Sequence, residues 1–533
     1  MNFNLAFPFS LHARRSPENV ALWIHGETWT YGEVHAFAQR TAAWLNLGVA
    51  QAPRRVGILA SRSLETYVGI LGTCWTGAAY VPISPKWPEE RLIGIFERTD
   101  LDALIVDAAG FELLSPRVLA VSPKRVLAPA GSPRNEAFGE NKISFHTLDD
   151  LQAFDPADEP AKVDAESLAY LIFTSGSTGV PKGVMISAGN ARAFVDAIQA
   201  RYQFQPDDRV AQPSEVSFDN SVFDLLNAWE AGAALFVVPA SQLVGPLRFL
   251  QENAITVWYS VPSFAVFMSR MKMLRPGALP ALRYSAFAGE ALPQSTAEAW
   301  KSAASNSIVD CLYGPTETTV VCTGDRYSDE AHVTESRGII SIGTPFPGTL
   351  AAIVNPHGNI VARGEEGELA IAGSQVALGY FKDEALTGER FPVIDGKRWY
   401  LTGDLAIEDE AGRFHHLGRV DNQVKIQGIR VELEEVEAHL RSASGSDSVA
   451  AVAWPMRYGT AERLVAFVSG ASVPIAEVSN RLKRSLPTYM VPARIYELDS
   501  IPMSSNGKID RNELARMLYE NHVEGQVAIA PPN

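Results

Sequence analysis

The chain has 533 residues, of which 46% are hydrophobic and 20% charged, so it can form more than one domain with a sizeable core. Its formal net charge of −15 argues against sequence-independent binding to nucleic acid or to an anionic membrane. The three cysteines, Cys74, Cys311 and Cys322, are too few for a disulfide scaffold and lack CxxC spacing, which indicates a reducing compartment.

The N-terminus does not have the pattern of a secretory signal. Its apolar stretch, residues 3–11, is followed rather than preceded by the basic residues Arg14 and Arg15. No apolar run approaches the length of about 18 residues that spans a bilayer. The sequence therefore predicts a cytoplasmic protein without a membrane partner.

Helical and strand-like patterns alternate through the first 350 residues. This alternation predicts an α/β fold with largely parallel sheets. The stretch 107–165 is richer in proline and charge and is expected to form loops or an irregular excursion. The expected helices cover 32–47 and 63–76, and the expected short buried strands cover 55–60, 103–106, 168–173, 234–238 and 254–259.

The strand pattern 168–173 leads into a polar, glycine-rich loop. Gly176, Gly179 and Gly183 let backbone N–H groups approach a ligand closely, while Lys182 adds a mobile cation. Hydroxyl groups supply further donors, which suits a polyphosphate. The spacing is not that of a Walker A loop, and a flexible Gly/Ser linker is the alternative interpretation. The hydroxyl residues are Thr174, Ser175, Ser177 and Thr178.

From about residue 345 the pattern changes to short strands with glycine-rich turns. Strands at 351–354 and 367–372 predict a small β-rich subdomain. A strand at 412–417 carries His415 and His416, for which a surface or packing role is expected rather than metal ligation. Beyond it, helices at 432–440 and 475–486 alternate with strands at 449–453 and 464–468, which predicts a small α+β unit.

The glycine-rich loop resembles the phosphate loop of the adenylate-forming superfamily. That family comprises acyl-CoA synthetases, luciferases and the adenylation domains of nonribosomal peptide synthesis. Its members activate a carboxylate with ATP and, in most cases, pass the acyl group to a thiol. The resemblance extends from Thr30 to Lys508 with the segments in family order. It assigns nucleotide binding to Thr174, Ser175, Gly176, Ser177, Thr178, Gly179 and Lys182, with Thr178 also catalytic.

The family organisation implies two domains. The resemblance places an adenylation core domain at 1–420, with parallel-rich sheets and the β-rich subdomain. A mobile α+β lid domain follows at 421–520, and an Ala/Pro-rich tail at 521–533. In the family the lid rotates between two half-reactions, so that one active site serves both.

A second motif runs from Tyr313 to Glu317. Pro315 after Gly314 favours a tight turn that would display Thr316 and Glu317. By itself this is as consistent with an ordinary turn. The resemblance implies that Tyr313 stacks on adenine, that Gly314 and Thr316 contact the nucleotide, and that Glu317 helps to hold Mg²⁺, the expected metal cofactor.

Four further charged residues match motifs of the adenylate-forming superfamily. It implies that Asp404 binds the ribose hydroxyls, that Arg419 contacts the nucleotide and that Asp421 is the hinge. It also implies that Lys508 reaches the substrate carboxylate and the α-phosphate as a catalytic electrostatic group. Taken alone, Asp404 could be a turn residue, and Lys508 a surface hairpin lysine.

Asp219 distinguishes the branches of the family. In members that activate amino acids, an aspartate at this position pairs with the substrate ammonium, and a buried carboxylate needs such a cation. Asp219 could instead cap the helix predicted at 222–229. The other substrate-binding positions are mostly apolar, which favours a small or medium uncharged amino acid. These positions are Asn220, Phe223, Ser260, Ala286, Ala288, Gly289, Leu312, Val320 and Val321.

The function predicted from these residues is an amino acid–[carrier protein] ligase that forms aminoacyl-AMP from ATP. Too few residues precede Tyr31 for a condensation domain, and too few follow Arg511 for a carrier domain, so a separate phosphopantetheine carrier protein is the expected partner. Two alternatives remain open at this point. One is an acyl-CoA synthetase acting on a non-amino acid, and the other is a non-catalytic nucleotide-binding relative.

Overall fold

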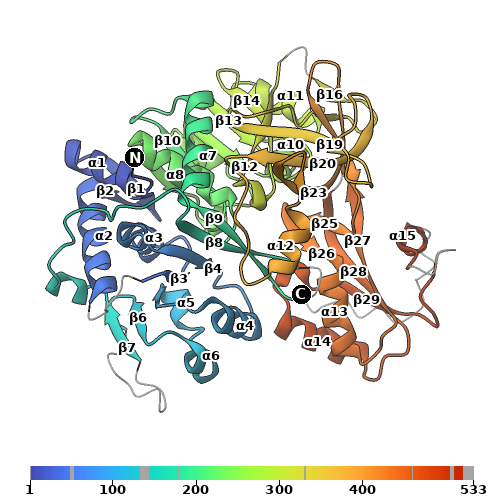
Figure 1. Ribbon diagram of the computed structural model, residues 1–533, viewed down its shortest axis with the longest axis horizontal. Helices are drawn as coiled ribbons and strands as arrows, with labels where there is room; N and C mark the ends of the chain where they lie inside the picture. Colours follow the sequence, from blue (N-terminus) through green and yellow to red (C-terminus); the bar gives the residue numbers. More distant parts are fainter. Residues whose placement is uncertain are drawn as a thin grey trace. The chain divides into compact units, whose positions relative to one another are not determined.

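The computed structural model describes residues 2–47, 53–132, 143–176, 179–328, 332–458, 460–503 and 509–519. They form two compact units (Figure 1). Among the described helices, none combines the length and apolar character required to cross a bilayer. The first unit draws on residues 1–85, 96–172 and 183–418, and the second on 86–95, 173–182 and 419–533.

The first unit contains a nine-stranded sheet whose centre is parallel. Its strands lie in the order β18-β15-β14-β13-β12-β10-β11-β1-β2, and β2, β15 and β18 pair antiparallel with their neighbours. The strands are β1 (Val20–Ile24), β2 (Glu27–Thr30), β10 (Arg209–Gln212), β11 (Ala234–Val237), β12 (Val257–Ser260), β13 (Tyr284–Phe287), β14 (Ile308–Tyr313), β15 (Thr323–Arg326) and β18 (Thr344–Pro345).

An eight-stranded sheet has the order β21-β9-β8-β4-β3-β5-β6-β7. The pairs from β8 to β7 are parallel, and β21 pairs antiparallel with β9. Strands β8 and β9 contribute residues to both units. The strands are β3 (Arg55–Leu59), β4 (Ala79–Ile83), β5 (Ala103–Val106), β6 (Arg125–Ala128), β7 (Ser144–Thr147), β8 (Leu168–Thr174), β9 (Lys182–Ser187) and β21 (Gly379–Tyr380).

A smaller antiparallel sheet has the order β19-β20-β23-β22, with β24 on β23. This β-rich part agrees with the change of pattern in the sequence after residue 345. Strands β16 and β17 form a separate antiparallel pair. The strands are β16 (Val333–Thr334), β17 (Ile339–Ile340), β19 (Thr349–Val354), β20 (Glu366–Gly373), β22 (Val393–Ile394), β23 (Lys397–Glu408) and β24 (Phe414–Arg419).

Helices connect the strands, and α2, α3 and α7 each begin with a capping box. At α2, the Thr30 hydroxyl accepts from the Glu33 N–H at 3.2 Å, and the Glu33 carboxylate accepts from the Thr30 N–H at 2.8 Å. The helices, including α4, which contributes to both units, are α1 (Phe7–Arg15), α2 (Tyr31–Asn46), α3 (Leu64–Thr76), α4 (Glu89–Thr99), α5 (Ala108–Phe111), α6 (Pro116–Val121), η1 (Asp150–Ala153), α7 (Ala188–Tyr202), α8 (Asn220–Ala231), η2 (Ala240–Gln242), α9 (Leu247–Glu252), α10 (Pro262–Arg270), α11 (Gln294–Ala303), η3 (Thr316–Thr318) and α12 (Glu384–Arg390).

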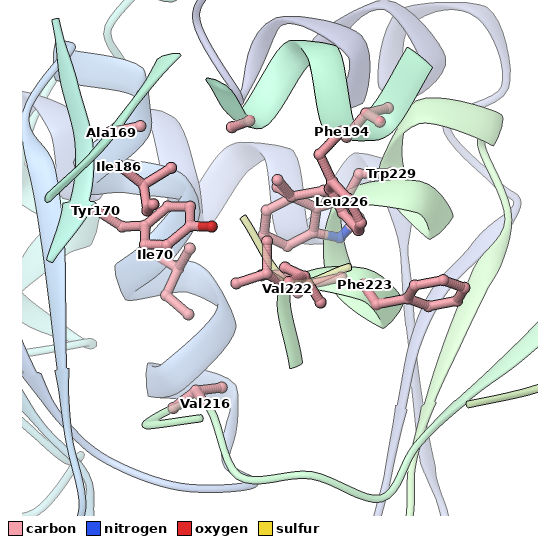
Figure 2. Packing of buried hydrophobic residues seen from close by; sticks show 14 of the residues in the cluster. Ile70, Ala169, Tyr170, Ile186, Phe194, Val216, Val222, Phe223, Leu226 and Trp229 are labelled. Atoms are coloured by element: carbon pink, nitrogen blue, oxygen red, sulfur yellow. The ribbon is translucent and has the colours of Figure 1, made fainter. Parts of the chain in front are cut away.

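The core of the first unit joins α8 to the parallel strands. Figure 2 shows the ring of Tyr170, from β8, with Ile70 of α3 and Ile186 of β9, while Val222 and Trp229 extend from α8. All of these side chains are buried. Each fully buried apolar side chain of this size contributes about 1.5–3 kcal/mol. Because α8 begins at Asn220, this packing also fixes the position of Asp219.

The second unit contains a five-stranded mixed sheet in the order β26-β25-β28-β27, with β29 on β28. Its apolar core packs α13 and α14 against this sheet. The elements are β25 (Gln423–Ile426), β26 (Ile429–Glu432), α13 (Leu433–Ser444), β27 (Val449–Arg457), β28 (Thr460–Val468), α14 (Ile475–Ser485), η4 (Thr488–Met490), β29 (Arg494–Glu497) and α15 (Arg511–Tyr519).

The α/β class with parallel-rich sheets is confirmed, but two local expectations are wrong. The stretch 107–165 forms not only loops but also helices α5 and α6 and strands β6 and β7, whose four residues each are too short for a clear periodicity. Strand β12 begins at Val257 rather than at residue 254, because Ala254 has a left-handed backbone with φ of 46°.

Candidate active site

Asp404 of β23 lies in a buried hydrogen-bonded cluster. Its Oδ2 accepts from the Tyr313 hydroxyl at 2.5 Å, and its Oδ1 lies 3.3 Å from Nε2 of His416. The Tyr313 phenol is buried, and burial followed by the charge of Asp404 raises its pKa well above the ordinary value. The structure thus brings together two residues that the sequence assigns to the nucleotide, and adds His416 to them.

His416 makes a contact that the sequence did not predict. Its side chain is half-buried and lies against Asp404. Nδ1 of His416 lies 2.7 Å from Nη1 of Arg337, which also donates to the His416 carbonyl at 3.1 Å. A histidine two residues before Gly418 gives no recognisable signal, because its partner lies on another strand.

Glu317 lies in the short helix η3 and is fully buried, so the turn does not display it as expected. Its Oε1 accepts from the Tyr380 hydroxyl at 2.8 Å, and its backbone carbonyl accepts from the Ala377 N–H at 2.9 Å. The segment after β20 therefore covers the glutamate. Its carboxylate oxygens are hard donors of the kind that Mg²⁺ prefers, so the residue suits the expected metal.

The turn after η3 has an unusual backbone. Thr319 and Val320 have φ of 59° and 71°, a left-handed conformation that β-branched residues rarely adopt. Gly314 allows the close approach of this turn, because a Cβ there would lie 2.5 Å from the Val321 Cα. Buried Gln375 donates from Nε2 to the carbonyl of Val321 at 2.7 Å and so holds the turn.

Asp219 immediately precedes α8 and is half-buried. Its side chain makes no capping hydrogen bond to that helix, so the capping alternative is not supported. Burial raises the pKa of Tyr170 and Tyr259, and the negative charge of Asp219 raises both further. The carboxylate therefore lies close enough to two buried phenols to influence both.

Next to Asp219, the ring of Phe223 stacks on that of Tyr259 with the centroids 4.0 Å apart and the planes 19° from parallel. The Tyr259 hydroxyl donates to Oδ1 of Asn220 at 3.0 Å. The Ser260 hydroxyl accepts from Nε1 of Trp258 at 2.9 Å. The polar atoms of two predicted substrate-binding residues are therefore already engaged within the protein.

The other predicted substrate-binding residues lie at or near the carboxyl ends of neighbouring parallel strands. The register pairs Ser260 with Phe287 and Phe287 with Cys311, so β12, β13 and β14 end side by side. Ligands of parallel α/β sheets typically bind at this edge. Ala286, Ala288, Leu312, Val320 and Val321 are all buried there, and Gly289 follows with a φ of 86°.

Residues 173–182 of the glycine-rich loop belong to the second unit, where two donors of the loop already hold anionic oxygens. The Gly176 N–H donates to Oε2 of Glu435 at 3.0 Å, and Nζ of Lys182 lies 3.5 Å from Oε1 of Glu432. A Cβ at Gly176 would lie 2.0 Å from the Val180 carbonyl, so only glycine fits. The carboxylates occupy positions where phosphate oxygens would find the same donors.

Two further loop residues are described. Ser175 donates to the Arg430 carbonyl at 3.1 Å, while the buried Thr174 hydroxyl has no hydrogen-bond partner among the described residues. Gly179 has a φ of 82°, which glycine adopts without strain. Ser177 and Thr178 lie outside the described residues.

Of the remaining assigned residues, Arg419 and Asp421 form a bidentate ion pair in the second unit, with distances of 2.6 and 2.7 Å. Thr316 of η3 is half-buried. Lys508 lies outside the described residues. Within the described ranges, no group of three or more histidine, cysteine or acidic side chains is arranged so that it could hold a metal ion.

Comparison with known families gives a match to the AMP-binding enzyme family over residues 9–381. The chain belongs to this family. Syringomycin synthase SyrB1 of Pseudomonas syringae pv. syringae is 34% identical over 526 residues, which cover 95% of this chain and 80% of that protein. Tyrocidine synthase 3 of Brevibacillus parabrevis is 32% identical over 98% of this chain, but the chain spans only 8% of the length of that protein.

Comparison with solved structures agrees with this family. The crystal structure of the Vibrio cholerae adenylation domain AlmE in complex with glycyl-adenosine-5'-phosphate matches with a TM-score of 0.86 and 30% identity, covering 98% of both chains. The resemblance to adenylation domains of nonribosomal peptide synthesis is therefore confirmed.

Proposed function

We propose that this protein activates an amino acid with ATP and transfers it to the phosphopantetheine thiol of a separate carrier protein. In the first step a substrate carboxylate oxygen attacks the α-phosphorus, and the bond to the leaving pyrophosphate breaks. In the second step the thiolate sulfur attacks the carbonyl carbon of the aminoacyl-AMP, and AMP leaves. The observation that carries this proposal is the half-buried carboxylate of Asp219 at the start of α8.

Asp219 is a half-buried carboxylate that does not cap the helix it precedes. It lies near Tyr170 and Tyr259, whose buried phenols carry no positive charge. A substrate ammonium group would be attracted to a carboxylate at this place. An amino acid brings this group together with the carboxylate to be activated, whereas a fatty or aryl acid does not.

The donor set of the glycine-rich loop supports ATP as the second substrate. Gly176 and Lys182 already bind carboxylate oxygens of Glu435 and Glu432. The same N–H and ammonium donors match phosphate oxygens in charge and reach. Mg²⁺ would be held by Glu317 and would neutralise charge on the phosphates when bound.

Nucleotide recognition is assigned to the remaining motif residues. Thr174, Ser175, Ser177, Thr178 and Gly179 bind the phosphates with Gly176 and Lys182, and Tyr313, Gly314, Thr316 and Arg419 complete the site. Asp404 receives the ribose hydroxyls. Its Oδ1 and Oδ2 each have a donor on the protein, which fixes the plane of the carboxylate for that task.

Lys508 has a catalytic role, and Asp421 has a mechanical one. Lys508 masks the repulsion between the substrate carboxylate and the α-phosphate, and it stabilises charge in the transition state. Asp421 is the hinge between the core domain, residues 1–420, and the lid, residues 421–520. We expect Lys508→Ala to abolish most adenylation while amino-acid binding persists, and Asp421→Pro to affect the two half-reactions unequally.

The substrate is a small or medium uncharged amino acid. The residues assigned to its side chain include no charged group besides Asp219, so a charged side chain would be buried without a partner. Stacked Phe223 and Tyr259 fill space beside Asn220. The complex of AlmE with glycyl-adenosine-5'-phosphate supports a substrate at the small end of this range.

The experiment is amino-acid-dependent ATP–pyrophosphate exchange across a panel of amino, fatty and aryl acids. We expect exchange with a few small uncharged amino acids. Asp219→Asn keeps the shape but removes the charge, and it should raise KM for the amino acid by about tenfold or more while KM for ATP changes little. Exchange only with fatty or aryl acids would identify an acyl-CoA synthetase and contradict the role of Asp219.

The thiol acceptor is tested separately. The protein is incubated with the preferred amino acid, ATP and either a holo carrier protein or free coenzyme A, and thioester formation is measured by mass spectrometry. Transfer of the amino acid to the phosphopantetheine on the serine of the carrier supports the proposal. Transfer to free coenzyme A alone would contradict the carrier as partner.

A further inference from the structure

The contacts of His416 determine where its ring proton lies. Nη1 of Arg337 is 2.7 Å from Nδ1 of the imidazole. A guanidinium has donors only and does not lose its proton in proteins. Nδ1 must therefore accept a hydrogen bond, which leaves the ring neutral and places its single proton on Nε2.

The protonated nitrogen points at Asp404. Nε2 of His416 lies 3.3 Å from Oδ1 of the carboxylate, and the Tyr313 hydroxyl donates to Oδ2 at 2.5 Å. Each carboxylate oxygen thus receives a donor from a different strand, β24 or β14. Together they hold the carboxylate plane on β23 against rotation.

We propose that His416 is a positioning residue that orients the Asp404 carboxylate for the ribose of the nucleotide, in a tautomer imposed by Arg337. This inference rests on the proposed role of Asp404 as the ribose ligand. It extends that role by two residues, because Arg337 fixes His416 and His416 fixes Asp404. Neither residue touches the nucleotide in this scheme.

The position of Arg337 in the fold favours its contact with His416. Arg337 lies between β16 and β17 and is held to β24 by its second bond, from Nη1 to the His416 carbonyl at 3.1 Å. Burial lowers the pKa of Arg337, and the charge of Asp404 offsets only part of that shift. A guanidinium nevertheless keeps its proton in proteins, so Arg337 stays charged close to the carboxylate that it orients through the imidazole.

The adjacent histidine supplies a matched control. His415 lies on the opposite face of β24, with Nδ1 3.0 Å from the Thr334 hydroxyl and Nε2 3.4 Å from the carboxylate of Asp409. It is the same residue type on the same strand, but its described partners do not include Asp404. His415→Phe should therefore leave nucleotide recognition unchanged.

The test is equilibrium binding of Mg–ATP and of Mg–2'-deoxyATP, which does not depend on the identity of the amino acid. We expect the native protein to bind ATP about tenfold more tightly than 2'-deoxyATP, since one ribose hydrogen bond to a charged group is lost. His416→Phe should weaken ATP binding several-fold and bring the two affinities close together. His416→Gln, whose amide can donate in place of Nε2, should restore most of the preference.

The second readout is the tautomer itself. Nitrogen-15 spectra of the labelled histidines, with the His416 signals assigned from their loss in the His416→Gln protein, should show a protonated Nε2 and an unprotonated Nδ1. Arg337→Leu should relax this preference without removing the ring. A protonated Nδ1 in the native protein would overturn the inference.

The variants also separate the inference from the function on which it rests. If Asp404→Ala leaves the preference for ATP over 2'-deoxyATP intact, Asp404 does not bind ribose and the proposed function loses that assignment. If Asp404→Ala abolishes the preference but His416→Phe does not, only the role of His416 is overturned. Should His416→Phe fail to fold, the pair His416→Gln and His416→Asn decides, because only glutamine reaches Asp404.

Discussion

The side chain of Gln375 donates from Nε2 to the carbonyl oxygen of Val321 at 2.7 Å, and this bond holds a turn whose backbone is strained. The same amide lies 3.3 and 3.4 Å from the carbonyls of Thr318 and Thr319. The Thr319 hydroxyl in turn donates to the Gln375 carbonyl at 2.6 Å. One buried residue therefore fixes the turn that carries Val320 and Val321.

Two isosteric substitutions test this brace. Gln375→Met removes the donors, and we expect it to raise KM for the amino acid several-fold while KM for ATP changes less. Each left-handed β-branched residue costs about 1–3 kcal/mol, so the turn relaxes when the donors are lost.

Gln375→Glu is the matched variant, because it replaces the donor by an anionic oxygen facing three carbonyls. We expect Gln375→Glu to be the more damaging of the two, in KM and in the free energy of unfolding. Equal effects of the two substitutions would show that the side chain fills space but does not brace the turn.

The hydroxyl of Tyr380 donates to Oε1 of Glu317 at 2.8 Å and orients the carboxylate assigned to Mg²⁺. Tyr380→Phe removes that donor alone. Partners of this kind typically change metal affinity by about 10–100-fold, so the Mg²⁺ concentration for half-maximal exchange should rise by about tenfold. Measurement of exchange as a function of Mg²⁺ at saturating ATP tests the effect.

Tyr80→Phe is the control for that substitution. The Tyr80 hydroxyl is buried and has no hydrogen-bond partner among the described residues, so its removal should leave the Mg²⁺ requirement unchanged. An identical shift in both variants would mean that the effect of Tyr380→Phe is a general loss of packing.

The three thiols predict a dependence of stability on pH. Burial raises the pKa of Cys74, Cys311 and Cys322 to about 12 in the folded protein. In the unfolded chain the pKa of a thiol is about 8.5. The unfolded state therefore loses thiol protons first, and this contribution to stability is present below pH ~8.5 and declines between pH ~8.5 and ~12.

Urea unfolding at pH 8 and pH 10 measures this loss. The midpoint should fall at the higher pH, and the fall should be smaller in a protein with all three cysteines replaced by alanine. At pH 8 a thiol reagent should label the native protein slowly and the denatured protein quickly. Rapid labelling of the native protein at three sites would contradict the burial of the thiols.

Short apolar runs between polar residues were predictable from sequence. The strand expected at 103–106 has the same bounds in β5, because four apolar residues lie between Asp102 and Asp107. The motif residues were assigned by resemblance, and two of them, Asp404 and Tyr313, lie together in the structure. What the resemblance did not provide is the set of residues that hold them.

Gln375 and His416 show why those residues could not be found. Gln375 contacts Val321 across 54 positions of the sequence, and nothing near either residue indicates the other. His416 meets Asp404 only because β24 pairs with β23 in one register, and a shift by one residue would direct His415 there instead. Such contacts depend on tertiary structure and leave no local pattern.

Stacking between Phe223 and Tyr259 predicts a change of substrate range. The two rings lie 4.0 Å apart, and both are buried beside the residues assigned to the substrate. Phe223→Ala removes one ring, and the space it leaves should admit larger apolar side chains. We expect kcat/KM for leucine to rise by about tenfold relative to glycine or alanine, since a few methylene groups in an apolar site contribute about 1–3 kcal/mol.

Tyr259→Phe serves as the control, because it keeps the stacked rings and removes only the hydrogen bond to Asn220. Its substrate preference should stay close to that of the native protein. The free energy of unfolding should fall by about 3–5 kcal/mol in Phe223→Ala, as for other large-to-small changes in a core, so exchange is measured well below the midpoint of thermal unfolding. A Phe223→Ala protein that keeps the native preference would show that this ring does not limit the size of the substrate.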